Sequence, residues 1–220
     1  MEWRNNMDCC AHNQGLNQLF GEGAARSELK QYWQKGIDKH ARAIVEAVSA
    51  RGVQGLSVLE VGAGLGGLHV ELLKRGAARA TDVDVSSAYI AAAQAVAEKL
   101  GLRDRVDYRV EDFARQADQI PASDIVVMHR VVCCYPDMPR LVTAAAQHAQ
   151  RLMALSFPPG AWYMRVFEKI MNFGMWVTRS SFRLYVHPPQ AILATAEASG
   201  LRLVQQKSSW PWQIMAFERA

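Results

Sequence analysis

Short apolar runs alternate with longer amphipathic segments along most of the chain. The apolar runs predict strands at 57–61, 78–83, 106–110, 124–129, 152–157, 201–207 and 213–218. Between them, helical spacing of apolar positions covers 68–74, 88–100, 138–151 and 190–199. This alternation is typical of an α/β fold in which helices cover a mostly parallel sheet.

Two segments do not follow the alternation. Residues 1–56 have the pattern of two or three helices, including 27–35 and 38–49, and we expect them to form a helical cap. Residues 159–187 form an insertion after the fifth strand that is crowded with aromatic and methionine side chains. This stripe fits a hydrophobic core, the wall of a pocket for a small molecule or, with its interleaved arginines and lysine, a face that lies on a membrane.

The composition is that of a globular protein. Of 220 residues, 50% are hydrophobic and 21% are charged, which excludes a disordered chain. The sequence has no 18-residue uncharged apolar stretch and starts with a polar segment, so we expect neither a membrane span nor a signal peptide, and a cytoplasmic location. The net charge of +4 comes from residues 151–220, without the lysine and arginine runs of a nucleic-acid binder.

The four cysteines occur as two adjacent pairs, Cys9-Cys10 and Cys133-Cys134. Neighbouring cysteines rarely bridge each other, and a cytosolic chain keeps its thiols reduced. Three roles of the cysteines stay open: they can be buried as small hydrophobic side chains, form a redox-sensitive bridge that holds a lid, or bind a metal as thiolates. We assign no metal ligand.

A glycine-rich turn follows the first predicted strand. Gly62, Gly64 and Gly67 fit the fingerprint of dinucleotide-binding enzymes, whereas Gly62, Gly64 and Gly66 fit the nucleoside loop of methyltransferases. The spacing of the glycines alone therefore does not choose between the two cofactors.

Acidic residues at the ends of three successive strands separate the alternatives. Glu60 stands two residues before the first glycine, where a carboxylate suits a cationic sulfonium cofactor and not a pyrophosphate. Asp84 closes the second strand, where it can hold two ribose hydroxyls, and Glu111-Asp112-Phe113 closes the third, where adenine can bind. Helix capping explains any one of these acids but explains the set poorly.

With these residues the chain resembles the class I S-adenosylmethionine-dependent methyltransferases. The resemblance implies a Rossmann-like, seven-stranded, mostly parallel sheet with helices on both faces and an antiparallel last strand. It also implies S-adenosylmethionine as cofactor and S-adenosylhomocysteine as product. By matching, the cofactor residues are Glu60, Gly62 and Gly64 at the methionine end, Asp84 and Val85 at the ribose, and Asp112 and Phe113 at the adenine.

The downstream half is similar to the magnesium-protoporphyrin O-methyltransferases. The similarity lies in 124–136, which runs from the fourth strand to Tyr135-Pro136, in 155–159, and in Arg183-Leu184-Tyr185-Val186-His187. That family has a catalytic histidine immediately before Tyr-Pro, where this chain has Cys134. A hydroxyl or carboxyl acceptor can need a base, and the candidate bases are His129, Tyr135, His187 and His40. Of these, His129, Tyr135 and His187 are the predicted catalytic residues, and Met128 is added to the cofactor contacts.

The sequence thus predicts a single methyltransferase domain. Its expected parts are a cap over 1–56, a cofactor-binding half over 57–158, an acceptor-side insertion over 159–187 and a terminal helix and strand pair over 188–220. The expected reaction is methyl transfer, to oxygen before nitrogen or sulfur, on a small, largely apolar acceptor, for which an anionic group stays open. Competing hypotheses are an NAD-dependent oxidoreductase and a binding module without catalysis. We expect no nucleic-acid partner and keep peripheral membrane contact as a hypothesis; the oligomeric state stays open.

Overall fold

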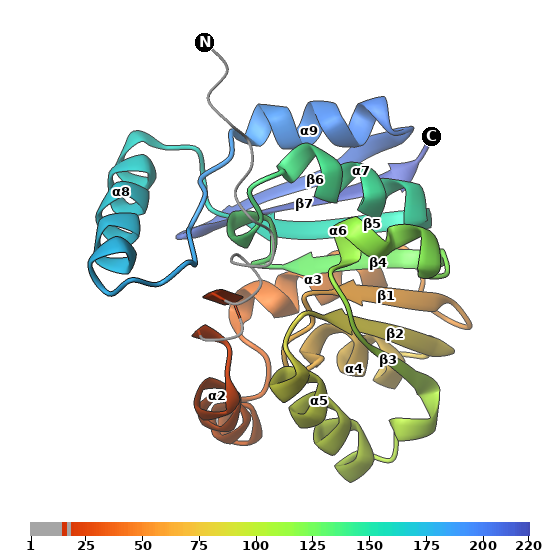
Figure 1. Ribbon diagram of the computed structural model, residues 1–220. Helices are drawn as coiled ribbons and strands as arrows, with labels where there is room; N and C mark the ends of the chain where they lie inside the picture. Colours follow the sequence, from red (N-terminus) through yellow and green to blue (C-terminus); the bar gives the residue numbers. More distant parts are fainter. Residues whose placement is uncertain (1–14, 17–18) are drawn as a thin grey trace.

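A seven-stranded sheet forms the centre of the molecule (Figure 1). The computed structural model describes residues 15–16 and 19–220. The strands lie in the order β3-β2-β1-β4-β5-β7-β6, and only β7 runs antiparallel to its neighbours. Their bounds are β1 Ser57–Val61, β2 Arg79–Asp84, β3 Val106–Val110, β4 Ser123–His129, β5 Ala149–Phe157, β6 Leu201–Ser209 and β7 Trp212–Arg219. The predicted fold class and all seven predicted strands are confirmed.

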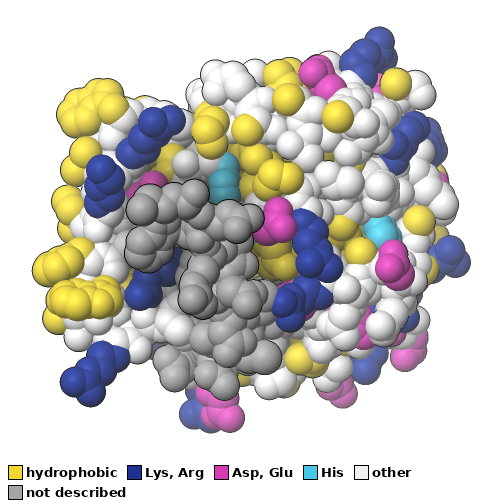
Figure 2. Space-filling view, turned by 45° about the horizontal axis from the view of Figure 1, so that its top comes forward, with side chains coloured by type: hydrophobic (Ala, Val, Ile, Leu, Met, Phe, Trp, Pro, Cys, Tyr) yellow, Lys and Arg dark blue, Asp and Glu magenta, His cyan; other side chains and the backbone are white. Residues whose placement is uncertain are grey.

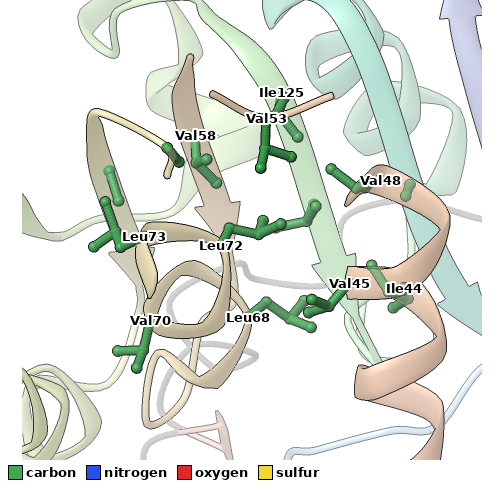
Figure 3. Close-up of a cluster of buried hydrophobic side chains, with 14 of the residues drawn as sticks. Ile44, Val45, Val48, Val53, Val58, Leu68, Val70, Leu72, Leu73 and Ile125 are labelled. Atoms are coloured by element: carbon green, nitrogen blue, oxygen red, sulfur yellow. The ribbon is translucent and has the colours of Figure 1, made fainter. Parts of the chain in front are cut away.

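One face of the sheet is covered by α3 (Lys39–Ser49), α4 (Gly67–Lys74) and α5 (Ser87–Lys99). Branched side chains of α3 and α4 interdigitate with those of β1 and β4, as Figure 3 shows for Ile44, Leu68, Leu72 and Ile125. These side chains are fully buried or nearly so. Their burial fixes α3, and with it the cap, against the strand that carries the glycine turn.

The other face is covered by α6 (Phe113–Gln116), α7 (Met138–His148) and α9 (Pro189–Ala198). Helix α9 begins at a proline and is followed by Gly200 with φ of 82°, as the sequence predicts. Short 3₁₀ turns complete the connections: η1 Arg103–Arg105, η2 Ala117–Gln119 and η3 Val132–Cys134. Both faces are therefore closed by helices, and the sheet's carboxyl edge is left for a site.

The prediction of a helix over 138–151 is wrong at its end. Helix α7 stops at His148, and β5 begins at Ala149. The His148 ring bonds the carbonyl oxygens of Ala144 and Ala117, and the Arg219 guanidinium bonds that of Ala149. The Ala144 carbonyl belongs to α7, whereas Ala117 lies in η2 and Ala149 begins β5, so these contacts hold the end of α7 where the chain turns into the strand.

The cap and the insertion project from the carboxyl side of the sheet. The cap contains α2 (Glu22–Lys35) and α3, which begins after Asp38, whose Oδ1 accepts the backbone N–H groups of His40 and Ala41. The insertion contains α8 (Trp162–Val177), which stands apart from the sheet in Figure 1. None of the described helices has the length and apolar character needed to cross a membrane.

Candidate active site

A cavity of about 830 Å³ lies at the carboxyl ends of β1 to β4. Helix α2 and the α2–α3 connection form its roof, and the segment after α8 contributes Phe182 and Leu184. Most predicted site residues line it: Glu60, Gly62, Gly64, Asp84, Val85, Asp112, Phe113, His129 and Tyr135. The topology therefore brings together residues that are up to 75 positions apart in the chain.

The glycine turn forms the floor of the cavity under the cap. Gly62 and Gly64 have φ values of 62° and 56°, a left-handed conformation that favours glycine. A Cβ atom on Gly62 would lie 2.5 Å from Val131 Cγ2. The turn thus requires glycine both for its backbone conformation and for its close approach to the segment after β4.

Asp84 holds the glycine turn as well as facing the cavity. Its Oδ2 accepts the Gly64 N–H at 2.9 Å, and its Oδ1 accepts the Ser86 N–H at 2.8 Å. Burial raises the pKa of Asp84 above its ordinary value, while these two hydrogen bonds act in the opposite direction. Each carboxylate oxygen keeps a second lone pair with which a ligand hydroxyl can bond.

Glu60 is part of a buried cluster beneath the turn. Its Oε2 accepts both the backbone N–H and Nδ1 of His69, each at 2.8 Å. Asp82 Oδ2 lies 3.9 Å from the same His69 nitrogen, and neither oxygen of Asp82 has a hydrogen-bond partner among the described residues. Burial raises the pKa of Asp82 well above its ordinary value, and the charges of Glu60 and Asp84 add to this effect. Burial thus favours the neutral form of Asp82, and His69 orients the carboxylate that lines the cavity.

The end of β3 supplies two further acids and an aromatic ring. Asp112 Oδ1 accepts the Tyr135 hydroxyl at 3.2 Å, whereas Oε2 of the neighbouring Glu111 is buried and has no hydrogen-bond partner in the part of the chain that the structure describes. The Phe113 ring packs edge-on against His148, with 5.2 Å between ring centroids. Phe113 therefore belongs to the core and reaches the cavity only as part of its wall, while Glu111 has an unused acceptor.

The described wall of the cavity is strongly acidic. It contains six carboxylates but only one guanidinium, that of Arg130, and no lysine. The carboxylates belong to Glu28, Asp38, Glu60, Asp84, Glu111 and Asp112. A wall of this charge favours a cationic ligand and opposes the pyrophosphate of a dinucleotide.

His129 at the end of β4 is held from two sides. Its Nδ1 lies 2.7 Å from Ser156 Oγ, and its Nε2 lies 3.2 Å from Asp38 Oδ2. Arg130 also bonds Asp38, at 2.8 Å, and stacks on Trp212 with 5.1 Å between the guanidinium carbon and the ring centroid. Burial opposes ionisation of Asp38, but the hydrogen bond from His129 and the charges of His129 and Arg130 bring its pKa well below the ordinary value.

The backbone conformation of Arg130 is unusual. It is a non-glycine residue with φ of 62°, a conformation that costs energy and concentrates at functional sites. Its backbone N–H donates to Ser156 Oγ at 3.1 Å, so the same hydroxyl braces both His129 and Arg130. Asp38 and Arg130 were not among the predicted site residues. The N-cap position of Asp38 indicates the start of a helix but not a contact with a residue 91 positions away.

Tyr135 and the second cysteine pair lie at the same rim of the cavity. Burial raises the pKa of Tyr135 well above its ordinary value, and Asp112 adds to the shift, which disfavours the phenolate needed of a base. Cys133 is buried and Cys134 half-buried, with 3.8 Å between their sulfur atoms. Cys9 and Cys10 lie outside the described residues.

Two predicted site residues lie away from the cavity lining. Met128 is fully buried in the core between the sheet, α7 and α9. His187 Nε2 bonds the Tyr135 backbone oxygen at 2.9 Å, and its ring stacks on Tyr185. The contacts of His187 thus attach the segment after α8 to the loop after β4. Since His187 does not line the cavity, its catalytic role stays a prediction.

The contacts of His187 predict a small pH dependence of stability. Burial lowers the pKa of His187, although its bond to the Tyr135 carbonyl acts in the opposite direction. The unfolded chain then binds a proton more readily than the native chain, so the free energy of unfolding should rise as pH increases from about 5 to about 7. We expect His187→Gln to flatten this rise in urea titrations carried out across that pH range, and an unchanged slope would contradict the assignment.

Comparisons with known proteins agree with this geometry. Residues 58–153 match the family described as a methyltransferase domain. These residues carry β1 to β4, the glycine turn and every predicted cofactor residue. The segment that builds the cofactor side of the cavity therefore matches a methyltransferase domain. No curated protein matches the chain in sequence.

Solved structures share the fold of this methyltransferase domain at low identity. A magnesium protoporphyrin IX methyltransferase from Synechocystis PCC 6803 with bound SAH has a TM-score of 0.74 at 20% identity, over 95% of this chain and 100% of that one. An O-methyltransferase family protein from Burkholderia thailandensis has a TM-score of 0.66 at 17% identity, over 86% and 59%. The [4+2]-cyclase SpnF has a TM-score of 0.63 at 14% identity, over 80% of each chain. These likenesses establish the fold, which is compatible with more than one reaction.

Proposed function

We propose that the protein transfers a methyl group from S-adenosylmethionine to an oxygen atom of a small, largely apolar acceptor that carries an anionic group. The observation that carries this proposal is the cavity itself, with acids around the glycine turn and apolar side chains opposite. A sulfonium cofactor with an ammonium group is cationic at both centres, which complements the acidic wall. The name of the Burkholderia neighbour, an O-methyltransferase family protein, gives further support for transfer to oxygen.

The cofactor fits the residues on the floor of the cavity. The lone pairs of Asp84 suit ribose hydroxyls, and the unpartnered Oε2 of Glu111 is an acceptor for a further hydrogen-bond donor of the nucleoside. The turn at Gly62 and Gly64 allows close approach of the amino-acid end, whose charge Glu60 complements. When bound, the cofactor supplies an electrophilic methyl group on sulfur, and the protein's main task is to orient the acceptor toward it.

The acceptor side of the cavity is largely apolar. Phe20 from the cap and Phe182 from the segment after α8 meet edge-on, with 6.3 Å between ring centroids, and Leu184 lies on the same wall. Arg130 is the only basic side chain in the described lining, and it lies beside Trp212. These features suit a flat or branched apolar acceptor whose anionic group bonds the Arg130 guanidinium.

His129 is the base that the geometry supports best. Ser156 Oγ already accepts the Arg130 N–H, and it can also accept a hydrogen from His129 Nδ1. In that tautomer Nε2 carries no proton and takes that of an acceptor hydroxyl, and the imidazolium formed in this way donates its new Nε2–H to Asp38 Oδ2, which lies 3.2 Å away. In this account Asp38 and Ser156 are positioning residues, while His129 touches the acceptor.

The competing hypotheses differ in what they require of the cavity. An NAD-dependent oxidoreductase needs a wall that tolerates a pyrophosphate, and six carboxylates in the lining oppose one. A binding module without catalysis needs the floor of the cavity but not the braced His129–Asp38 pair. The braced pair therefore favours an enzyme.

The test is methyl transfer by the purified full chain. Methyl-labelled S-adenosylmethionine is incubated with panels of apolar carboxylic acids, phenols, amines and thiols, and label in each product is counted. We expect label on acids or phenols, dependent on the protein. Labelling confined to amines or thiols would contradict transfer to oxygen, and no labelling alongside tight cofactor binding would favour the binding module.

A further inference from the structure

Helix α8 exposes a continuous apolar face to solvent. Of the described helices with eight or more residues, α8 alone buries no side chain. Trp162 is 77% exposed, and Ile170, Phe173 and Trp176 are each 64–65% exposed. The exposed apolar face, hereafter the α8 face, consists of Trp162, Tyr163, Val166, Phe167, Ile170, Phe173, Trp176 and Val177.

Helical spacing places these side chains on one side of α8. Val166, Ile170, Phe173 and Val177 follow one another at intervals of three or four residues, so they form one stripe along the helix. Scattered exposed apolar residues are normal on a protein surface, but a contiguous set of this extent marks an interaction site. Figure 2 shows hydrophobic side chains gathered at the left side of the molecule, with basic side chains beside them.

The inner side of α8 is fixed to the rest of the protein. Asn172 Nδ2 donates to the Leu184 carbonyl, and Asn172 Oδ1 accepts the Leu184 N–H, both at 2.8 Å. The Tyr185 N–H in turn donates to the Cys133 carbonyl at 2.8 Å. Because these bonds attach the opposite side of α8 to the segment that follows it, the helix has a fixed orientation in which the α8 face is directed toward solvent.

The charges around the α8 face have one predominant sign. Residues 159–187 contain four basic side chains and a single acid, Glu168. Arg165, Lys169 and Arg179 are exposed, whereas Glu168 is half-buried. Lysine and arginine can extend their charged ends to lipid phosphates while their aliphatic stems follow apolar side chains into the interface.

We propose that the α8 face docks on the surface of an anionic lipid bilayer. Tryptophan and tyrosine side chains favour the boundary between headgroups and acyl chains, and the basic side chains complement a negative surface. Protein interfaces, by contrast, are depleted of lysine, and the charge arrangement offers no acid on this face to pair with a basic partner. Since the segment that follows α8 also lines the cavity, docking would hold the acceptor side of the cavity close to the bilayer.

The experiment is flotation of the full chain with lipid vesicles. Vesicles of equal parts phosphatidylglycerol and phosphatidylcholine are compared with vesicles of phosphatidylcholine alone. We expect the wild type to bind the anionic vesicles at least tenfold more tightly than the neutral ones, with binding weakened by salt. The double variant Ile170→Ser/Phe173→Ser should lose at least tenfold in affinity for the anionic vesicles.

A matched charge-reversal pair tests the location of the surface. Arg165→Glu/Lys169→Glu should weaken binding to anionic vesicles at least tenfold. The control Arg151→Glu/Arg202→Glu makes the same change in net charge at exposed positions near the starts of β5 and β6. This control should keep most of the binding. Thermal melting checks that all variants fold, as expected of exposed sites. The proposal would be overturned if the wild type did not bind vesicles, or if both charge variants lost the same amount of binding. It would also be overturned if the wild type formed a dimer that the serine substitutions dissociate and bound no vesicles.

Discussion

Asp84→Asn is expected to weaken S-adenosylmethionine binding by tenfold or more. Both carboxylate oxygens of Asp84 accept backbone N–H groups, and an asparagine amide can accept only one of them. The substitution therefore turns an N–H group of the side chain against Gly64 or Ser86 and removes a charged acceptor from the ribose. Loss of charge-assisted hydrogen bonds of about 1.5–3 kcal/mol corresponds to this change in affinity, which calorimetric titration measures.

Asp107→Asn is the matched control for this substitution. The Asp107 side chain is 57% exposed and bonds Arg109 on the same strand, outside the cavity lining. This variant should bind the cofactor like the wild type. Equal affinities in the wild type and Asp84→Asn would remove Asp84 from the cofactor site.

His129→Gln is expected to lower kcat for methyl transfer by about 10²–10³, while cofactor affinity changes little. A positioned general base contributes about 10²–10⁴ in rate, and glutamine retains hydrogen bonding without accepting a proton. Asp38→Asn should lower kcat by a smaller factor of about ten, because it keeps the side chain's shape but not the charge opposite the imidazolium. Steady-state kinetics with the best acceptor from the panel measures both variants.

The two variants also separate catalysis from structure. If His129 only ties β4 to the cap, His129→Gln should lower the melting temperature and cofactor affinity together and leave kcat nearly unchanged. Loss of rate at normal stability and normal cofactor affinity supports the base. A full-rate His129→Gln enzyme would contradict it.

The fold was predictable because local patterns decided it. The apolar runs of β1, β2, β4 and β5 are short and mostly buried, and the turns between strands and helices carry glycines at positions of positive φ, such as Gly62, Gly76 and Gly200. The end of α7 was missed because its stop depends on His148 and Arg219, which act through contacts distant in sequence. The helix propensities of neighbouring residues do not depend on such long-range contacts, so they could not predict this end.

Only the part of the site that lies directly at the ends of strands could be predicted from the sequence. Acids that follow β1, β2 and β3 must converge at one edge of a parallel sheet, so Glu60, Asp84 and Asp112 were accessible to sequence reasoning. Asp38 was not, because its approach to His129 depends on how α3 packs against the sheet. Nor did spacing alone separate the two uses of the insertion; α8 carries the exposed face, and only Phe182 and Leu184 after it reach the cavity.

The central claim is that the acidic cavity beneath the cap binds S-adenosylmethionine. Calorimetric titration of the full chain with S-adenosylmethionine and, separately, with NAD tests this most directly. We expect S-adenosylmethionine to bind at one site per chain with micromolar affinity, and NAD not to bind. Binding of NAD without binding of S-adenosylmethionine would contradict the account.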